Sequence, residues 1–126
     1  MDRHKRILVV DDEAPIRRVL ELKLKNGGYD VFLAGDGEAA LRIIESEKPD
    51  AVITDINMPR MDGKQLCEAT NHLKIARTFL TIIMTARIIP DEEIWITAMQ
   101  DTVFMEKPFS PSSILECIDQ YFGVKR

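Results

Sequence analysis

The sequence predicts an α/β fold: a doubly wound, five-stranded parallel sheet covered by helices on both faces. Short apolar runs alternate with helix patterns along the whole chain. The runs are apolar at almost every position, as expected for strands that are buried on both faces of a sheet. Strand-then-helix alternation of this kind produces parallel strands joined by right-handed crossovers.

Five apolar runs are the predicted strands. They span residues 7–10, 31–34, 51–54, 80–84 and 103–105. The first run stops at Asp11 and Asp12, the third at Asp55 and the fourth at Thr85. The fifth is followed closely by Lys107. Polar residues therefore follow four of the five predicted strands.

Helix patterns accompany these strands. The first begins near Pro15, which suits a first helical turn, and stops at the glycine pair 27–28. Its apolar positions are Ile16, Val19, Leu20 and Leu24. Apolar residues at helical spacing mark three more helices, at 40–44, 66–73 and 94–99. Ser110 is expected to cap the fifth, whose apolar face carries Ile114, Ile118, Tyr121 and Phe122.

Length and composition predict one ordinary domain, spanning residues 1–126. The hydrophobic fraction of 45% and the charged fraction of 30% are normal for a globular protein. A net charge of −4, with scattered basic residues, argues against a nucleic-acid-binding surface. The one dense basic group, residues 3–6, is interpreted as a short solvated leader.

Cysteine usage and hydropathy predict a cytoplasmic protein. Cys67 and Cys117 are far apart and have no partner at metal-ligand spacing, so they are interpreted as small core residues in a reducing compartment. No signal peptide and no apolar run long enough to span a membrane is found. No membrane association is predicted.

The predicted fold would gather five polar residues at one edge of the sheet. Ligand sites of open α/β sheets form beyond the carboxyl ends of the strands. Asp11, Asp12, Asp55, Thr85 and Lys107 all follow strand ends, so distant parts of the sequence would meet there. Taken singly, each has an ordinary explanation, such as a helix cap, a turn former or a surface lysine. The prediction of a site rests on all five reaching one edge.

The chemistry of these residues indicates phosphoryl transfer with Mg²⁺. Three carboxylates in one crevice repel one another unless they are protonated, paired or bound to metal. Mg²⁺ prefers carboxylate, carbonyl and water oxygens, often completed by a phosphate. Lys107 adds a mobile positive charge and Thr85 a hydroxyl donor. A carboxylate nucleophile with a metal and a lysine suits phosphoryl transfer, which depends on positioning and charge neutralisation.

Four segments resemble the response-regulator receiver domains of two-component signalling, among them the chemotaxis regulators. They are residues 7–13 (ILVVDDE), 55–63 (DINMPRMDG), 85–86 (TA) and 107–109 (KPF). They are spread over nearly the whole chain and together are highly specific, although each alone would be weak. The resemblance implies a flavodoxin-like (βα)5 fold.

The resemblance also implies a role for each matching residue. Asp55 would take a phosphoryl group from a sensor histidine kinase or phosphotransfer protein. Asp12 would bind Mg²⁺ directly, Asp11 directly or through water, and the backbone carbonyl of Asn57 would be a further ligand. Lys107 would pair with Asp55 and then with its phosphate.

A switch is implied as well. Thr85 would move to hydrogen-bond the phosphoryl group, and Phe104 would then turn inward and reshape the face around the fourth helix, the fifth strand and the fifth helix. That face would control a downstream protein or a fused output domain, and a homodimer through it is one alternative. The physics agrees, because phosphate adds about −1.5 to −2 charge that biases one of two conformations.

The segment before the fifth strand departs from the family pattern. The family usually has Gly-Ala there, whereas this chain has Gln100 and Asp101. Residues 87–90 are unusually apolar, and Trp95 makes the fourth helix apolar on more than one side. A repacked core and a hydrophobic interaction surface both remain open interpretations.

Three rival functions are weaker. A phosphohydrolase of the haloacid-dehalogenase type needs a second aspartate two residues after the nucleophile, where this chain has Asn57. A flavin- or nucleotide-binding module needs a phosphate-cradling first turn, which Asp11 and Asp12 would oppose. A degenerate receiver that only docks would not need the acidic pair, acceptor, threonine and lysine together. The chain is therefore predicted to be a phosphoacceptor switch and not an enzyme, beyond autophosphorylation from small donors and autodephosphorylation.

Overall fold

The computed structural model of the chain describes residues 4–55, 63–70, 79–85, 101–106 and 110–126. Its strands are β1 (Arg6–Val10), β2 (Asp30–Ala34), β3 (Ala51–Asp55), β4 (Leu80–Thr85) and β5 (Thr102–Glu106). Its helices are α1 (Ala14–Asn26), α2 (Gly37–Glu47), α3 (Gly63–Thr70) and α6 (Pro111–Phe122). The helix predicted at 94–99 lies outside the described residues.

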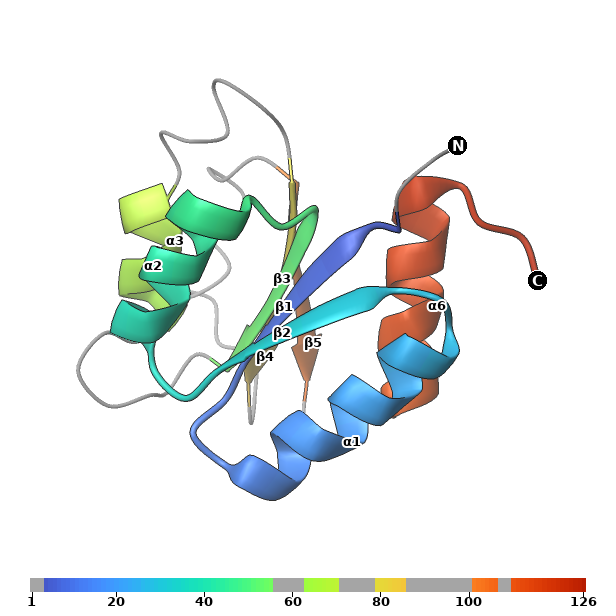
Figure 1. The fold of residues 1–126 in the computed structure, drawn as a ribbon, viewed down its shortest axis with the longest axis horizontal. Coiled ribbons are helices and arrows are strands. Elements are labelled where there is room, and N and C mark those ends of the chain that lie inside the picture. The colour runs from blue at the N-terminus through green and yellow to red at the C-terminus, as the bar shows by residue number, and fades with distance from the viewer. Residues whose placement is uncertain (1–3, 56–62, 71–78, 86–100, 107–109) are drawn as a thin grey trace.

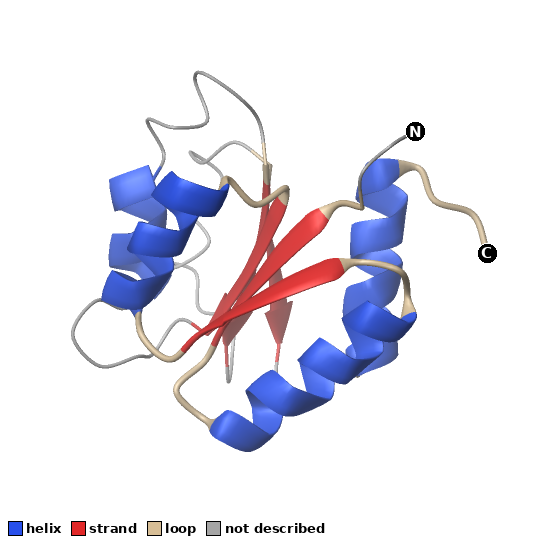
Figure 2. Cartoon of the chain, in the orientation of Figure 1, coloured by secondary structure: helices blue, strands red, loops and turns tan. Residues whose placement is uncertain are grey.

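The five strands form one parallel sheet in the order β2-β1-β3-β4-β5. This is the flavodoxin-like order, and the predicted doubly wound sheet is confirmed. Helices α1 and α6 cover one face of the sheet, while α2 and α3 cover the other (Figures 1 and 2). Each predicted strand is present, and its ends lie within one residue of the expected ones.

Each face of the sheet has its own hydrophobic core. Alternate strand residues such as Ile7, Val9 and Ile53 pack with Leu20 and Ile114 on the side of α1 and α6. Their neighbours along the strands, Leu8, Val10 and Val52 among them, pack with α2 and α3. Because side chains of a strand alternate between faces, only nearly continuous apolar strands can supply two cores.

The helix ends follow local rules in part, and one apolar position of α1 differs from expectation. Pro15 lies in the first turn of α1, and the Asp36 side chain accepts a hydrogen bond from the Ala39 amide at the start of α2. Ser110 does precede α6 as predicted, but its side chain makes no capping bond. Val19, assigned to the apolar face of α1, is 50% exposed, because the covered stripe runs through Leu20 and Leu24.

Among the described helices, none has the length and apolar character needed to cross a lipid bilayer. Cys117 is a free thiol, partly buried against the core on the α6 side, and burial raises the pKa of that thiol. This environment agrees with the interpretation of Cys117 as a small core residue.

Candidate functional site

Three carboxylates meet at the carboxyl end of β1 and β3. Asp11 and Asp12 follow β1, and Asp55 is the last residue of β3. One oxygen from each of the three side chains lies within 4.8 Å of the others. Asp11 is fully buried, Asp55 is 7% exposed, and Asp12 faces solvent. The group therefore has two buried members and one that water can reach.

Strand register explains why these residues meet. Val10 of β1 pairs with Thr54 of β3 and with Ala34 of β2. The residue that follows β1, Asp11, therefore lies beside Asp55, and its amide still donates to the Ala34 carbonyl at 3.1 Å. A parallel sheet places the ends of neighbouring strands at one edge. The juxtaposition of Asp11 and Asp55 thus follows from pairing of the two central apolar strands.

The turn from β1 to α1 is held by hydrogen bonds to Asp11. Its Oδ1 accepts from the Glu13 amide at 2.9 Å, which forms a local turn. Its backbone carbonyl accepts from Nη1 of Arg17 at 2.6 Å. Glu13 has an extended backbone and precedes the first residue of α1. These bonds fix the direction in which the acidic pair leaves the strand.

Asp55 ends a strand that is buried along its whole length. The hydroxyl of the preceding residue, Thr54, donates to the Asp55 carbonyl at 3.0 Å. Thr54 itself is fully buried. The backbone that carries the Asp55 carboxylate is therefore part of the rigid centre of the sheet, as a site with fixed geometry requires.

The remaining predicted site residues fall into two groups. Thr85 is the last residue of β4, one step beyond the residue that pairs with Asp55. Phe104 lies in β5 opposite Ile83 and is half-buried. Asn57 and Lys107 lie outside the described residues. The described part of the chain thus brings the three aspartates together and places Thr85 at the same edge of the sheet.

The donor set of this site fits a hard divalent cation. Three like charges at this spacing, two of them shielded from water, are strongly repulsive without a counter-charge. All three donors are carboxylate oxygens, which Mg²⁺ prefers over nitrogen or sulfur ligands. Exposed Asp12 leaves the group open to water, so an ion could enter and keep part of its hydration shell. The residues present therefore suit Mg²⁺.

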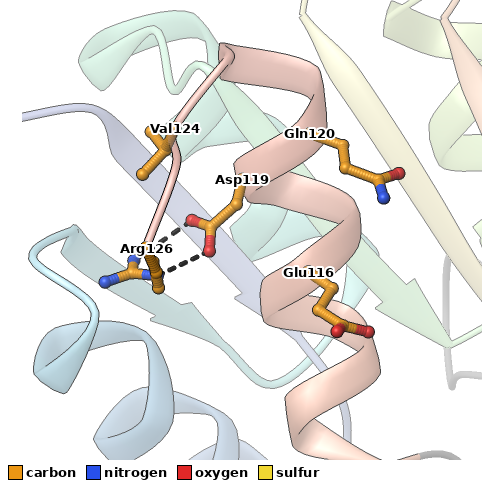
Figure 3. A pocket seen from close by; sticks show the side chains of 5 residues that line it. All are labelled: Glu116, Asp119, Gln120, Val124 and Arg126. Carbon is orange, nitrogen blue, oxygen red and sulfur yellow. Dashed lines mark hydrogen bonds and ion pairs between the residues drawn. The ribbon is translucent and has the colours of Figure 1, made fainter.

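Another buried carboxylate, which the sequence did not predict, lies near the amino ends of β1 and β2 in a cluster with a tyrosine and an arginine. Asp119 of α6 is 6% exposed and accepts a 2.6 Å hydrogen bond from the Tyr29 hydroxyl. Arg126 donates to both oxygens of Asp119, from Nε at 2.6 Å and from Nη2 at 3.1 Å (Figure 3). Arg126 Nη2 also donates to the Gly27 carbonyl.

The ionisation of this cluster is set by its internal partners. The hydrogen bond from Arg126 lowers the pKa of Asp119, against the opposing effect of burial, and the bond from Tyr29 lowers it further. Burial and the nearby Asp119 charge raise the pKa of Tyr29 well above its usual value. No local pattern in the sequence could have revealed the cluster, because Tyr29 and Asp119 are 90 residues apart.

Known proteins resemble this chain over most of its length. The sequence pattern of the response regulator receiver domain matches residues 7–119. The alkaline phosphatase synthesis transcriptional regulatory protein PhoP of Bacillus subtilis is 37% identical over 111 residues, which are 88% of this chain and 45% of that protein. The probable transcriptional regulator ycf27 of Porphyridium aerugineum is 39% identical over 109 residues, 86% of this chain and 44% of that protein. This chain thus spans less than half the length of either relative.

Solved structures give the same picture. A CheY-like response regulator receiver domain protein from Methanospirillum hungatei superposes with a TM-score of 0.88 at 27% identity, covering 96% of this chain and 95% of that one. The chemotaxis protein CheY4 of Vibrio cholerae superposes with a TM-score of 0.85 at 28% identity, covering 94% and 98%. Both cover almost the whole of each chain.

Proposed function

The chain belongs to the response regulator receiver domain family, and from that premise we propose that Asp55 is its phosphoryl acceptor. Receiver domains of this family are phosphoacceptor switches of two-component signalling. The observation that carries the assignment to Asp55 is its buried position at the end of β3 with Asp11 and Asp12 beside it. Within the described residues, it is the aspartate that combines a strand-end position with a neighbouring acidic pair.

Mg²⁺ would be held by Asp11, Asp12 and Asp55, with the backbone carbonyl of Asn57 as a further ligand. When bound, it would neutralise the carboxylates and the oxygens of an incoming phosphoryl group. The chain's own contribution is to hold the acidic pair next to Asp55 and to leave Asp12 open to solvent. A donor phosphoryl group could approach from the solvent-exposed side, where Asp12 lies, without disturbing the buried part of the site.

The reaction proposed for Asp55 is a simple displacement at phosphorus. One Asp55 carboxylate oxygen forms a P–O bond while the P–N bond of a donor phosphohistidine breaks. The departing imidazole nitrogen keeps the electron pair and takes a proton from water. Later attack by water on the acyl phosphate releases inorganic phosphate and restores the carboxylate. Asp55 therefore stores a phosphoryl group rather than turning over a substrate.

The output would arise from residues that recognise the new phosphate. Lys107 would pair with a phosphoryl oxygen and Thr85 would hydrogen-bond another. Thr85 ends β4, which neighbours β3, and Lys107 comes directly after β5 in the sequence. Movement of Thr85 would allow Phe104 in β5 to turn inward and change the face formed by β5 and its flanking helices. The target of this switched face is proposed to be a downstream protein or an output domain in the same protein.

The partners follow from the same scheme. A sensor histidine kinase or phosphotransfer protein would donate the phosphoryl group. The relatives are named as transcriptional regulators, and this chain matches less than half of their length, which suits a receiver that controls a separate output unit. We propose that residues 1–126 form one receiver domain that works in the cytoplasm.

Mass spectrometry after incubation with acetyl phosphate and Mg²⁺ tests the proposal. The wild-type chain should gain the mass of one phosphoryl group, and Asp55→Asn should gain none. Glu45→Gln, which removes an exposed carboxylate from α2, should behave like the wild type. Omission of Mg²⁺ should suppress the mass gain of the wild type and of Glu45→Gln. A phosphoryl group that still forms on Asp55→Asn would remove Asp55 from its assigned role.

A further inference from the structure

Arg17 connects helix α1 to the acidic turn. Its side chain is half-buried, and Nη1 donates to the Asp11 carbonyl at a short distance of 2.6 Å. A Cβ placed on Gly35 would lie 3.6 Å from the same nitrogen, so the guanidinium also packs against the turn between β2 and α2. Arg17 therefore contacts two turns at the carboxyl edge of the sheet as well as belonging to α1.

With the hydrogen bond from Arg17, both backbone polar groups of Asp11 are hydrogen-bonded. The Asp11 amide donates to β2 through the Ala34 carbonyl, and Oδ1 accepts from the Glu13 amide. The Asp11 carbonyl, the remaining polar group of its backbone, is held by Arg17. Asp12 lies between these two held neighbours, so its backbone has little freedom to change direction. The geometry of both acidic residues thus depends on a guanidinium six residues along the chain.

We propose that Arg17 is a positioning residue for Mg²⁺, because it holds the turn in which Asp11 and Asp12 present their carboxylates beside Asp55. This inference rests on the proposed function, since it concerns the same metal site. A charge-assisted hydrogen bond to a carbonyl is stronger than a neutral one and is well suited to holding a loop. Preorganised ligands bind a cation more tightly than ligands that must first be ordered.

Simple electrostatics predicts the opposite effect. Arg17 places a positive charge near three carboxylates, so its removal should favour a divalent cation by Coulomb's law. A positioning role predicts weaker Mg²⁺ binding once that positive charge is gone. The sign of the change in affinity therefore distinguishes the two effects.

Arg18 provides a matched control. It is the next residue of α1, is exposed, and carries the same charge. Arg17→Met and Arg18→Met both remove one positive charge and leave an unbranched side chain that suits a helix. Arg17→Lys keeps the charge but loses the planar guanidinium, so any effect it has reflects geometry.

The experiment is an amide NMR titration of the metal-free chain and its variants with MgCl₂. Arg17→Met should raise the Mg²⁺ dissociation constant by roughly three- to tenfold, which is part of the free energy of one charge-assisted hydrogen bond. Arg17→Lys should fall between Arg17→Met and the wild type, and Arg18→Met should stay within about twofold of the wild type or bind more tightly. Urea unfolding without Mg²⁺, measured in parallel, reports stability separately from affinity.

The outcomes separate failure of the positioning role from failure of the metal site itself. Arg17→Met and Arg18→Met with the same Mg²⁺ affinity would overturn the positioning role, and so would tighter binding by Arg17→Met. Lower stability of Arg17→Met with an unchanged dissociation constant would also overturn it, because it would show a purely structural role. A wild-type chain that does not bind Mg²⁺ would instead overturn the metal site itself, and this inference with it. Should Arg17→Met not fold, unchanged affinity in Arg17→Lys would overturn the positioning role.

Discussion

Asp11 and Asp55 at the carboxyl edge of the sheet, and Asp119 near its amino edge, are all buried carboxylates, but they have different neighbours. The first two lie beside a third carboxylate, within 4.8 Å. Asp119 is instead bonded to the Arg126 guanidinium and the Tyr29 hydroxyl. The carboxyl edge gathers three carboxylates around one point, whereas Asp119 near the amino edge is paired with a cation of the same chain.

This difference separates a binding site from a structural cluster. Removing one partner of a buried, hydrogen-bonded ion pair destabilises the fold, because the other charge is left uncompensated. A buried group of like charges lowers stability unless a cation or a proton compensates it. Burial of an aspartate is therefore a weak indication of function by itself, and the identity of its neighbours is the stronger one.

The largest expected effect on stability concerns Asp119. Asp119→Asn replaces one accepting oxygen with an amide that would face the Nε donor of Arg126. We expect a loss of about 1–2 kcal/mol in the free energy of unfolding at pH 7, which is below the roughly 3–5 kcal/mol typical of breaking a fully buried pair because the Arg126 side chain is 45% exposed. Urea unfolding measures it. Glu116→Gln, an exposed carboxylate on the same helix, should change stability by less than about 0.5 kcal/mol.

The Asp119 effect should also depend on pH. The pKa of Asp119 is lower in the folded chain than in the unfolded chain. The stabilising effect of the ionised carboxylate is therefore fully present above the unfolded pKa of about 3.9, and it is lost as the pH falls through the folded pKa. The gap between wild type and Asp119→Asn should therefore narrow as the pH is lowered below about 4. A gap that widened in acid would contradict the assigned ionised state.

A smaller effect is expected from the other side of the same cluster. Tyr29→Phe removes the hydroxyl that donates to Asp119 and should cost about 1 kcal/mol at pH 7. The pKa of Tyr29 is raised in the folded chain. The contribution of the neutral phenol to stability is therefore fully present below the unfolded pKa of about 10, and it is lost as the pH rises above that value toward the folded pKa. Urea unfolding at pH 7 and pH 10.5 should show the gap narrowing at the higher pH. An unchanged gap would mean that the phenol is not held neutral.

The smallest effect should have the opposite sign. Asp12→Asn removes one of three like charges and should stabilise the metal-free chain by roughly a few tenths of a kcal/mol, since Asp12 is exposed and screened. In saturating Mg²⁺ the order should reverse, because a ligand that binds the folded state stabilises it according to its affinity. Thermal unfolding with EDTA and with MgCl₂ tests both parts. Destabilisation in EDTA would show that the acidic group is not repulsive.

Local patterns were sufficient for much of the fold. The apolar runs that end at Asp11, Asp55 and Thr85 became β1, β3 and β4 almost residue for residue. Buried parallel strands must be apolar on both faces, and few other elements produce such short continuous runs. Val19 shows the limit of this method, because helical spacing marks an apolar residue without showing whether another element covers it.

Asp101 illustrates a local signal that is compatible with the structure but does not predict it. The residue has a left-handed backbone with φ of 49°, and its carbonyl accepts from the Thr81 amide. Aspartate tolerates this conformation better than most residues, although glycine would suit it more. The sequence placed Asp101 between a helix and a strand, whereas its backbone conformation became known only from the structure.

The sequence by itself determined the class of fold, which strands end in polar residues, and the expectation that Asp11, Asp12 and Asp55 would meet, because parallel strands bring their carboxyl ends to one edge. Tertiary structure alone decided how each charge is compensated. The contacts of Asp119 with Tyr29 and Arg126, and of Arg17 with the Asp11 carbonyl, depend on how helices pack on the sheet. Such contacts leave no periodic pattern, since a hydrogen bond between packed elements constrains single residues rather than a repeating face.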